Sequence, residues 1–189
     1  MSTAVILAGG YSSRMGVNKA ELKINEKTLL EIQINKVRAA GFNRILVSGY
    51  ETAGNDVISV PDIYPHKGPL SGIHAGLQAS ADDSCLILCV DMPLLPVKVL
   101  KDLYSQHTGG ITLLCHDGWI EPTVGVYDRS LLPRCEKILQ SDNTSIRILM
   151  RQVGYHEYDF DMDERYLLNC NTPEEYRQIC GLFDELFTE

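Results

Sequence analysis

The residues of this sequence that could do chemistry begin with a loop rich in glycine and positive charge. The stretch ILAGGYSSRMGVNK, residues 6–19, joins an apolar run to Gly9 and Gly10 and then to Arg14 and Lys19. Glycines let backbone N–H groups approach an anion closely, and the two cations add charge. The loop is neither a Walker A sequence nor G-x-G-x-x-G, since Lys19 does not follow a glycine and Gly9 adjoins Gly10. We interpret it as a phosphate site, with a plain turn between a strand and a helix as the alternative.

Two carboxylates follow other apolar runs. Asp91 stands in CVDMP, directly after the most apolar run of the chain, and Asp62 stands in VPDIYP. A buried carboxylate is costly unless a cation holds it, and Mg²⁺ bridges carboxylate and phosphate oxygens well. Asp91 is therefore a predicted magnesium ligand, and Asp62 a predicted contact to a nucleotide or a second metal. The alternatives are a helix N-cap for Asp91 and an ordinary turn residue beside Pro61 for Asp62.

A third feature is the stretch KGPLSG, residues 67–72. Pro69 fixes the backbone, and the pattern that follows is helical. The helix N-terminus carries partial positive charge and unpaired N–H groups, which favour an anion. The stretch predicts a second anion-binding element, with a capped helix start that binds no ligand as the alternative.

These residues must be positioned by alternating strands and helices. Short apolar runs predict strands, and stretches with 3.6-residue periodicity predict helices between them. This alternation predicts an α/β fold with a mostly parallel sheet, whose strand ends bring the loop and the two carboxylates to one edge. Asp117–Gly118 predicts a hairpin, so the sheet should be mixed. The expected strands are 3–7, 44–49, 56–62, 85–93, 110–127 (two strands) and 155–161; the expected helices are 26–41, 68–81, 95–107, 129–140, 143–153 and one from Thr172.

Composition limits the classes of protein that fit. The chain has 189 residues, a length typical of one domain, and a formal net charge of −8. An acidic protein is not expected to bind nucleic acid, although a local cationic pocket can still bind a phosphorylated small molecule. No apolar stretch is long enough for a membrane span, and the N-terminus lacks a signal peptide pattern. The six cysteines are scattered without a CxxC pair, which indicates free thiols in the cytoplasm rather than a zinc site.

Four motifs together resemble a known family. LAGGYSSRMGVNK, GPLSGIHAGL, CVDMPLLP and NCNTPEEY occur in this order, and the resemblance runs from residue 4 to residue 176. They resemble the molybdenum cofactor guanylyltransferase family of nucleotidyltransferases, the MobA type. The resemblance implies a Rossmann-like three-layer nucleotidyltransferase fold with a mostly parallel, mixed central sheet, formed by a single domain over residues 1–189. The loop motif alone is specific only to the superfamily.

The resemblance also implies an activity and its residues. The family transfers GMP from GTP to the phosphate of Mo-molybdopterin with Mg²⁺, and it releases pyrophosphate. Lys19, Asp91 and Arg14 become the expected catalytic residues, with Asp91 as the metal ligand. The expected nucleotide-binding residues are Leu7, Ala8, Gly9, Gly10, Lys19, Asp62 and Asp91, and the expected pterin-side residues are Asn169 and Asn171.

The expected partners are GTP and Mo-molybdopterin, together with other proteins of cofactor biosynthesis and the molybdenum enzymes that receive the product. Two positions depart from the family pattern: VSGY lacks an asparagine after the second strand, and Glu121 precedes Pro122. A cytidylyltransferase for molybdopterin, or another nucleotidyltransferase for a small-molecule phosphate, is the alternative. A nucleotide-binding protein without catalysis is a third possibility, which the presence of both Lys19 and Asp91 disfavours.

Overall fold

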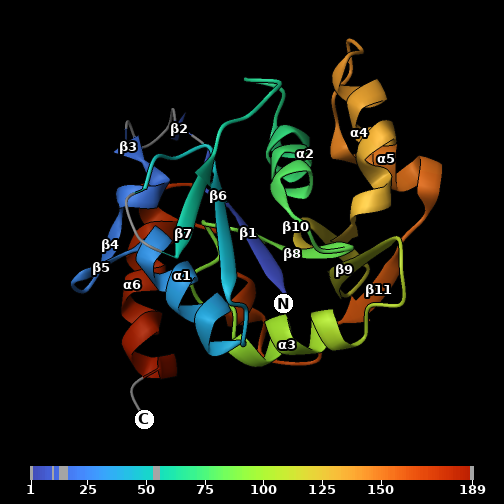
Figure 1. Cartoon of the computed structure of the whole chain (residues 1–189). Helices are drawn as coiled ribbons and strands as arrows, with labels where there is room; N and C mark the ends of the chain where they lie inside the picture. The colour runs from blue at the N-terminus through green and yellow to red at the C-terminus, as the bar shows by residue number, and fades with distance from the viewer. Residues whose placement is uncertain (1, 10, 13–16, 53–55, 188–189) are drawn as a thin grey trace.

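A seven-stranded sheet forms the centre of the molecule (Figure 1). The computed structural model describes residues 2–9, 11–12, 17–52 and 56–187. The sheet order is β11-β9-β10-β8-β1-β6-β7. The strands are β1 (Thr3–Leu7), β6 (Arg44–Ser48), β7 (Val57–Val60), β8 (Ser84–Cys89), β9 (Ile111–His116), β10 (Trp119–Asp128) and β11 (His156–Asp159). The helices are α1 (Leu29–Ala39), α2 (Pro69–Ala79), α3 (Val97–Ser105), α4 (Leu132–Leu139), α5 (Ile146–Val153) and α6 (Pro173–Phe187).

The sheet is mixed, as the hairpin signal predicts. β7, β6, β1 and β8 run parallel, whereas β10 runs antiparallel to both β8 and β9. Asp117 and Gly118 both have positive φ, 48° and 75°, which is the backbone that a tight hairpin turn needs. The expected α/β fold with a mostly parallel, mixed sheet is confirmed. The short strands β2 (Tyr11–Ser12), β3 (Val17–Asn18), β4 (Lys23–Ile24) and β5 (Lys27–Thr28) were not predicted.

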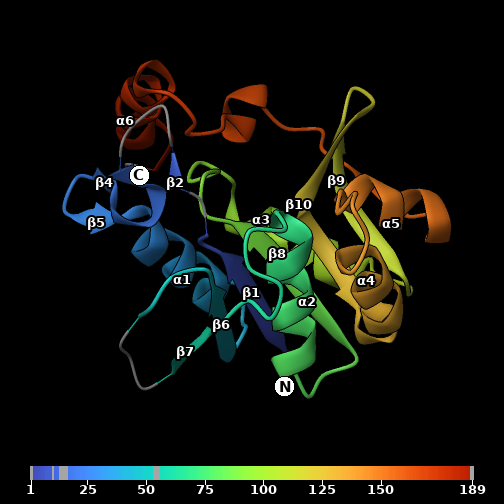
Figure 2. The ribbon, with the colours of Figure 1, turned by 90° about the horizontal axis from the view of Figure 1, so that it is seen from above.

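Helices cover both faces of the sheet and make two hydrophobic cores (Figure 2). α1, α3 and α6 contribute buried residues to one core, and α2, α4 and α5 contribute to the other. All five residues of β1 are buried because the strand is covered on both sides. The molecule therefore has three layers, with β1 and β8 at the centre.

The helix ends follow local sequence rules. Thr28 caps α1 and forms a capping box with Glu31, and the Glu175 N–H donates to Thr172 Oγ1 (3.2 Å) at the start of α6. Gly41 follows α1 with φ of +97°, a backbone conformation that glycine commonly adopts directly after a helix. Pro69 occupies the first turn of α2. These boundaries agree with the predicted ones to within a few residues.

Two glycines let α2 lie very close to the sheet. A Cβ at Gly76 would lie 2.5 Å from Val5 Cγ1, and one at Gly72 would lie 2.7 Å from Ser48 Oγ. Contacts that short do not occur between real side chains, so both positions need glycine. The close approach places the N-terminus of α2 beside the ends of β1 and β6.

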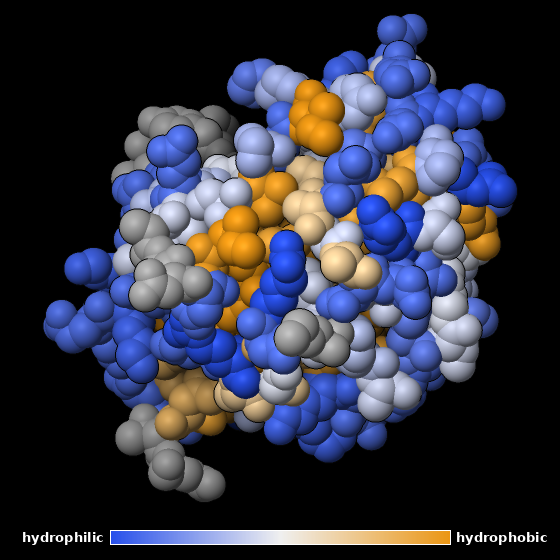
Figure 3. Space-filling model, viewed as in Figure 1, coloured by the Kyte–Doolittle hydropathy of each residue, from blue (hydrophilic) through white to orange (hydrophobic). Residues whose placement is uncertain are grey.

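Hydrophilic side chains cover most of the face in view in Figure 3, and hydrophobic ones gather near its middle. The exposed large hydrophobic residues of the described chain are Ile58, Ile63, Trp119, Tyr155 and Phe187. Among the described helices, none combines the length and the apolar character that crossing a membrane requires.

Candidate active site

The loop after β1 begins with backbone that the sheet still holds. The Ala8 N–H donates to Ser48 O (2.9 Å), and Leu7 O accepts from the Val90 N–H (3.1 Å). Leu7 and Ala8 are buried, whereas Gly9 is exposed at the end of the strand. Gly9 is thus the residue of this group best placed to present its backbone to a ligand. Gly10 and Arg14 lie outside the described residues.

Gly9 packs directly against Gly49 of the neighbouring strand end. A Cβ built on Gly49, whose φ is +80°, would lie 2.3 Å from Gly9 Cα. The two strand ends can approach this closely only because neither residue has a side chain. This contact brings the ends of β1 and β6 together where the loop leaves β1.

Lys19 and Asp91 form an ion pair at the carboxyl edge of the sheet. Lys19 Nζ donates to Asp91 Oδ2 (2.9 Å) and to Asn171 Oδ1 (2.6 Å). Both charged side chains are largely buried, with 13% of the Lys19 side chain and 21% of the Asp91 side chain exposed. Burial in a medium of lower polarity than water strengthens this attraction. The structure therefore brings together three predicted site residues that are far apart in the sequence.

Asp91 does not act as a helix cap. Pro96 is the N-cap residue of α3, which has no side-chain cap hydrogen bond. The Asp91 carboxylate is directed to Lys19, and its backbone O accepts from the Cys170 N–H (2.8 Å). The alternative reading of Asp91 as a cap is therefore wrong.

Asp62 lies in a separate, larger hollow next to the loop. A cavity of about 950 Å³ is lined by Gly9, Gly49, Tyr50, Glu51, Ser59, Val60, Pro61, Asp62, Pro65, His66 and Gly68. Ser48 Oγ donates to Asp62 Oδ1 (2.6 Å) and so orients the carboxylate. The serine in VSGY thus supports Asp62, a role that the sequence alone did not reveal. The volume suits a nucleoside.

The N-terminus of α2 lies between this cavity and the ion pair. Gly68, with φ of +76°, is the N-cap residue and makes no side-chain cap bond, and Pro69 follows it. A smaller cavity of about 130 Å³ is lined by Leu7, Gly9, Lys19, Pro69, Cys89, Val90, Asp91 and Thr123. Gly9 lines both cavities, so they are neighbours at the start of the loop. The helix N-terminus and Lys19 are positive groups at this junction, and both can attract a phosphate.

The other predicted asparagine lies outside the cavity that Lys19 and Asp91 line. Asn169 lines a narrow cavity with Met92, Leu114, His116, Trp119, Glu121 and Leu167. Trp119 is 70% exposed there, at the start of β10. The Glu121 carboxylate accepts from the Thr123 N–H (3.1 Å) and from Thr123 Oγ1 (2.6 Å). Glu121 therefore makes its hydrogen bonds within its own strand.

The donor set at Asp91 fits a hard divalent cation. A carboxylate oxygen and an amide oxygen, from Asp91 and Asn171, face the same cationic nitrogen of Lys19. Oxygen ligands of these two kinds are those that Mg²⁺ and Mn²⁺ take in proteins. The Lys19 ammonium thus stands where a metal ion would share the same oxygens. Nearby, burial raises the pKa of the Cys89 thiol well above its usual range, which keeps this sulfur neutral.

Comparisons with known proteins agree with this geometry. The family model described as "MobA-like NTP transferase domain" matches residues 4–157. A protein from Carboxydothermus hydrogenoformans, named "Probable molybdenum cofactor guanylyltransferase", is 33% identical, and the match covers 96% of each chain. The "Molybdenum cofactor guanylyltransferase" of Xanthomonas euvesicatoria is 32% identical over 94% of this chain and 93% of its own.

Solved structures share the fold. "Molybdopterin-guanine dinucleotide biosynthesis protein A" from Archaeoglobus fulgidus superposes with a TM-score of 0.82, at 21% identity, over 97% of this chain and 99% of that chain. A Mycobacterium tuberculosis protein, Rv0371C, described in complex with manganese, superposes with a TM-score of 0.68 over 95% of this chain and 97% of its own, at 16% identity. The Rossmann-like nucleotidyltransferase fold expected from the sequence is thus confirmed, and the chain belongs to the MobA-like NTP transferase family.

Proposed function

We propose that this protein transfers GMP from GTP to the phosphate of Mo-molybdopterin and releases pyrophosphate. An oxygen of the acceptor phosphate bonds to the α-phosphorus of GTP, and the bond from that phosphorus to the oxygen of the β-phosphate breaks. The observation that carries the proposal is the Lys19–Asp91–Asn171 cluster beside a cavity of nucleoside size. The relatives named molybdenum cofactor guanylyltransferase support the choice of both substrates.

The nucleotide would lie across the two neighbouring cavities. The base and ribose would occupy the larger one, where the Asp62 carboxylate accepts hydrogen bonds from the nucleoside. The phosphates would lie at Gly9, at the N-terminus of α2 and at Lys19. Arg14 belongs to the same loop, and we propose that it adds a second positive charge on the phosphates. Leu7, Ala8 and Gly10 would frame the loop through their backbone.

The chemistry needs positioning and charge neutralisation more than an activated side chain. A phosphate monoester has a second pKa of about 6, so the acceptor is already mostly ionised at neutral pH. Lys19 would stabilise the negative charge that develops on the α-phosphate and on the departing pyrophosphate. Asn169 and Asn171 would hold the acceptor on the opposite side of Asp91, so that it attacks in line with the bond that breaks.

A divalent ion belongs to this proposal, and we take it to be Mg²⁺. When bound, it supplies neutralisation of the phosphate oxygens. Asp91, with Asn171 beside it, would hold the ion. The relative described with manganese supports a divalent ion in this fold. Transfer of the product to molybdenum enzymes, with help from other proteins of cofactor biosynthesis, completes the proposal. A reducing compartment such as the cytoplasm suits the five buried cysteines, and we propose it as the location.

The test has two steps. Calorimetric titration with GTP, CTP, ATP and UTP, in the presence of Mg²⁺, should give preferential binding of GTP, and Lys19→Ala should weaken GTP binding. Lys23→Ala removes an exposed lysine of the adjacent strand β4 and serves as the matched control. Pyrophosphate release should then require molybdopterin as well as GTP. Preference for CTP would assign the protein to cytidylyl transfer, and binding without pyrophosphate release would argue against an enzyme.

A further inference from the structure

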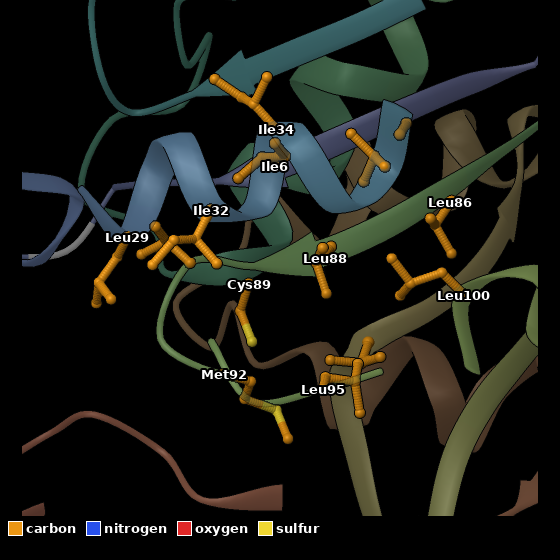
Figure 4. Packing of buried hydrophobic residues seen from close by; sticks show 14 of the residues in the cluster. Ile6, Leu29, Ile32, Ile34, Leu86, Leu88, Cys89, Met92, Leu95 and Leu100 are labelled. Atoms are coloured by element: carbon orange, nitrogen blue, oxygen red, sulfur yellow. The ribbon is translucent and has the colours of Figure 1, made fainter. Parts of the chain in front are cut away.

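Helix α1 reaches across the core to the backbone of the segment that carries Asp91. Gln33 Nε2 donates to two carbonyls of that segment, Cys89 O (3.0 Å) and Met92 O (3.0 Å). Lys36 Nζ, one helical turn further, donates to Pro93 O. Figure 4 shows α1 lying across β8, with Cys89 and Met92 below it. Two side chains of one helix thus hold three carbonyls of a single five-residue segment.

The backbone carbonyl of Asp91 itself is held by a different part of the chain. Asp91 O accepts from the Cys170 N–H (2.8 Å), in the chain that leads to Asn171. Four backbone carbonyls of residues 89–93 therefore have partners from elements that are distant in sequence. Backbone held this densely cannot shift without breaking several bonds together. The position of the Asp91 backbone, from which the carboxylate projects, is fixed as a result.

Stability alone does not account for Gln33 and Lys36. Both are buried, at 0% and 7% exposure, among apolar neighbours of α1 such as Ile32 and Val37. Within the described residues, Gln33 Oε1 is buried without a hydrogen-bond partner. Burying an amide and an amine costs free energy that apolar side chains of the same size would not cost. Buried polar side chains such as Gln33 and Lys36 are expected where function, rather than stability, requires them.

Within the described part of the chain, Lys36 forms no salt bridge with a carboxylate that would explain its burial. Its Nζ lies 5.4 Å from the centre of the Phe187 ring, on the wall of a cavity of about 440 Å³. Among the described residues, the only salt bridge formed by a lysine near this segment is that of Lys19. The bond to Pro93 O is accordingly the polar contact that orients the Lys36 side chain.

We propose that Gln33 and Lys36 are positioning residues, which fix the segment of residues 89–93 so that Asp91 can hold the metal ion. This inference rests on the proposed role of Asp91 as metal ligand. A displacement of about 1 Å at such a ligand is enough to weaken a site substantially. Loss of the supporting bonds should therefore weaken metal binding while the nucleoside cavity, which α1 does not line, stays intact.

The experiment measures the metal directly. Mn²⁺ binding to Gln33→Met and Lys36→Met is followed by the electron paramagnetic resonance signal of the free ion, and GTP binding is measured separately in metal-free buffer. We expect the Mn²⁺ Kd to rise about tenfold in each variant, with the metal-free GTP Kd unchanged. Val37→Ala, a fully buried core change in the same helix without a bond to residues 89–93, should lower the Tm without changing the Mn²⁺ Kd.

A double-mutant cycle separates positioning from general destabilisation. In an Asp91→Asn background, Gln33→Met should have no further effect on Mn²⁺ binding, because its effect passes through Asp91. An unchanged Mn²⁺ Kd in both methionine variants would overturn the inference. It would also be overturned if Gln33→Met weakened Mn²⁺ binding by the same factor in the wild type and in the Asp91→Asn background. If Asp91→Asn itself leaves Mn²⁺ binding intact, the metal assignment of the proposed function fails as well. If a methionine variant does not fold, Gln33→Asn is used instead. Its side chain keeps the amide but is one methylene shorter, so it should lose the bonds to residues 89–93.

Discussion

Lys19 and Asn171 are separated by 152 residues, yet the Lys19 ammonium lies 2.6 Å from Asn171 Oδ1 and also bonds Asp91. One cation thus joins the loop after β1, the end of β8 and the segment before α6. These are the groups proposed for the phosphate, the metal and the acceptor. If Asp91 and Asn171 hold a metal ion as proposed, Lys19 would have to exchange these two oxygens for those of a phosphate.

Asp91→Asn should nearly abolish turnover. The change keeps the shape of the side chain but removes the charge, so both the metal ion and Lys19 lose their anionic partner. We expect the kcat for pyrophosphate release to fall about a hundred- to a thousandfold. Asp56→Asn, at an exposed ion pair with Arg38, is the matched control and should keep full activity. Undiminished magnesium-dependent turnover in Asp91→Asn would contradict the assignment.

Lys19→Met should act in opposite directions on the two ligands. Without nucleotide, the ammonium competes with a metal ion for Asp91 and Asn171, so its removal should tighten Mn²⁺ binding by roughly fivefold, or about 1 kcal/mol. GTP binding should weaken, because the phosphates lose a positive charge. Paramagnetic resonance and calorimetry measure the two Kd values. Weaker Mn²⁺ binding would mean that Lys19 supports the metal site rather than competing for it.

Lys36 should give the protein a specific dependence of stability on pH. Burial lowers the pKa of this amine from 10.5 to about 7, an effect that Cys89 partly opposes. Between these values the unfolded chain binds a proton that the folded chain lacks, so the free energy of unfolding rises with pH. As pH falls toward 7, that stability is lost.

The comparison of the wild type with Lys36→Met isolates this effect. The stability of the wild type relative to the variant should increase by about 1–2 kcal/mol from about pH 7 to about pH 9, measured by urea unfolding. The other charged groups lining the same cavity, Glu26 and Lys27, are present in both proteins. Lys23→Met, an exposed lysine, should show no such trend relative to the wild type. A flat difference for Lys36→Met would mean that Lys36 is solvated.

Gly49→Ala should be far more damaging than Gly41→Ala. Both glycines have positive φ, +80° and +97°, so both substitutions incur backbone strain of about 1–3 kcal/mol. A Cβ at Gly49 would also lie 2.3 Å from Gly9 Cα, whereas one at Gly41 would have no neighbour within 4 Å. In thermal unfolding, the Tm of Gly49→Ala should be lower than that of Gly41→Ala. Only Gly49→Ala should weaken GTP binding. Equal effects would mean that the two strand ends separate easily.

Local sequence rules accounted for most of the elements. The periodicity of apolar residues located the strands of the sheet and the helices, and capping residues such as Thr172 gave their ends. The placement of Gly9, Asp62 and Asp91 at one edge of the sheet was predicted from the rule that the carboxyl ends of parallel strands lie at the same edge. The catalytic, metal and pterin roles of the named residues, the single domain and the Mg²⁺ ion stay predictions.

The supporting contacts could not be read from the sequence. Lys36 fits a helical pattern in which a lysine is expected at the surface, and only the packing of α1 over residues 89–93 makes it buried. Gln33 is hidden for the same reason. Pairing of Lys19 with Asn171 depends on the path of the chain after β11, which no local pattern specifies. Ser48 holds Asp62 because β6 and β7 are neighbours in the sheet.

The late position of Asn171 in the chain has a consequence during protein synthesis. Every strand of the sheet ends by Asp159, so the segment that carries Asn169 and Asn171 leaves the ribosome after the last strand. The residues that line the proposed nucleoside cavity, Gly9 to Gly68, are synthesised well before the two asparagines of the proposed acceptor side. Domains fold as they emerge, and contacts of high sequence separation form last. A newly made molecule would therefore acquire the ability to bind nucleotide before it acquires the ability to use it.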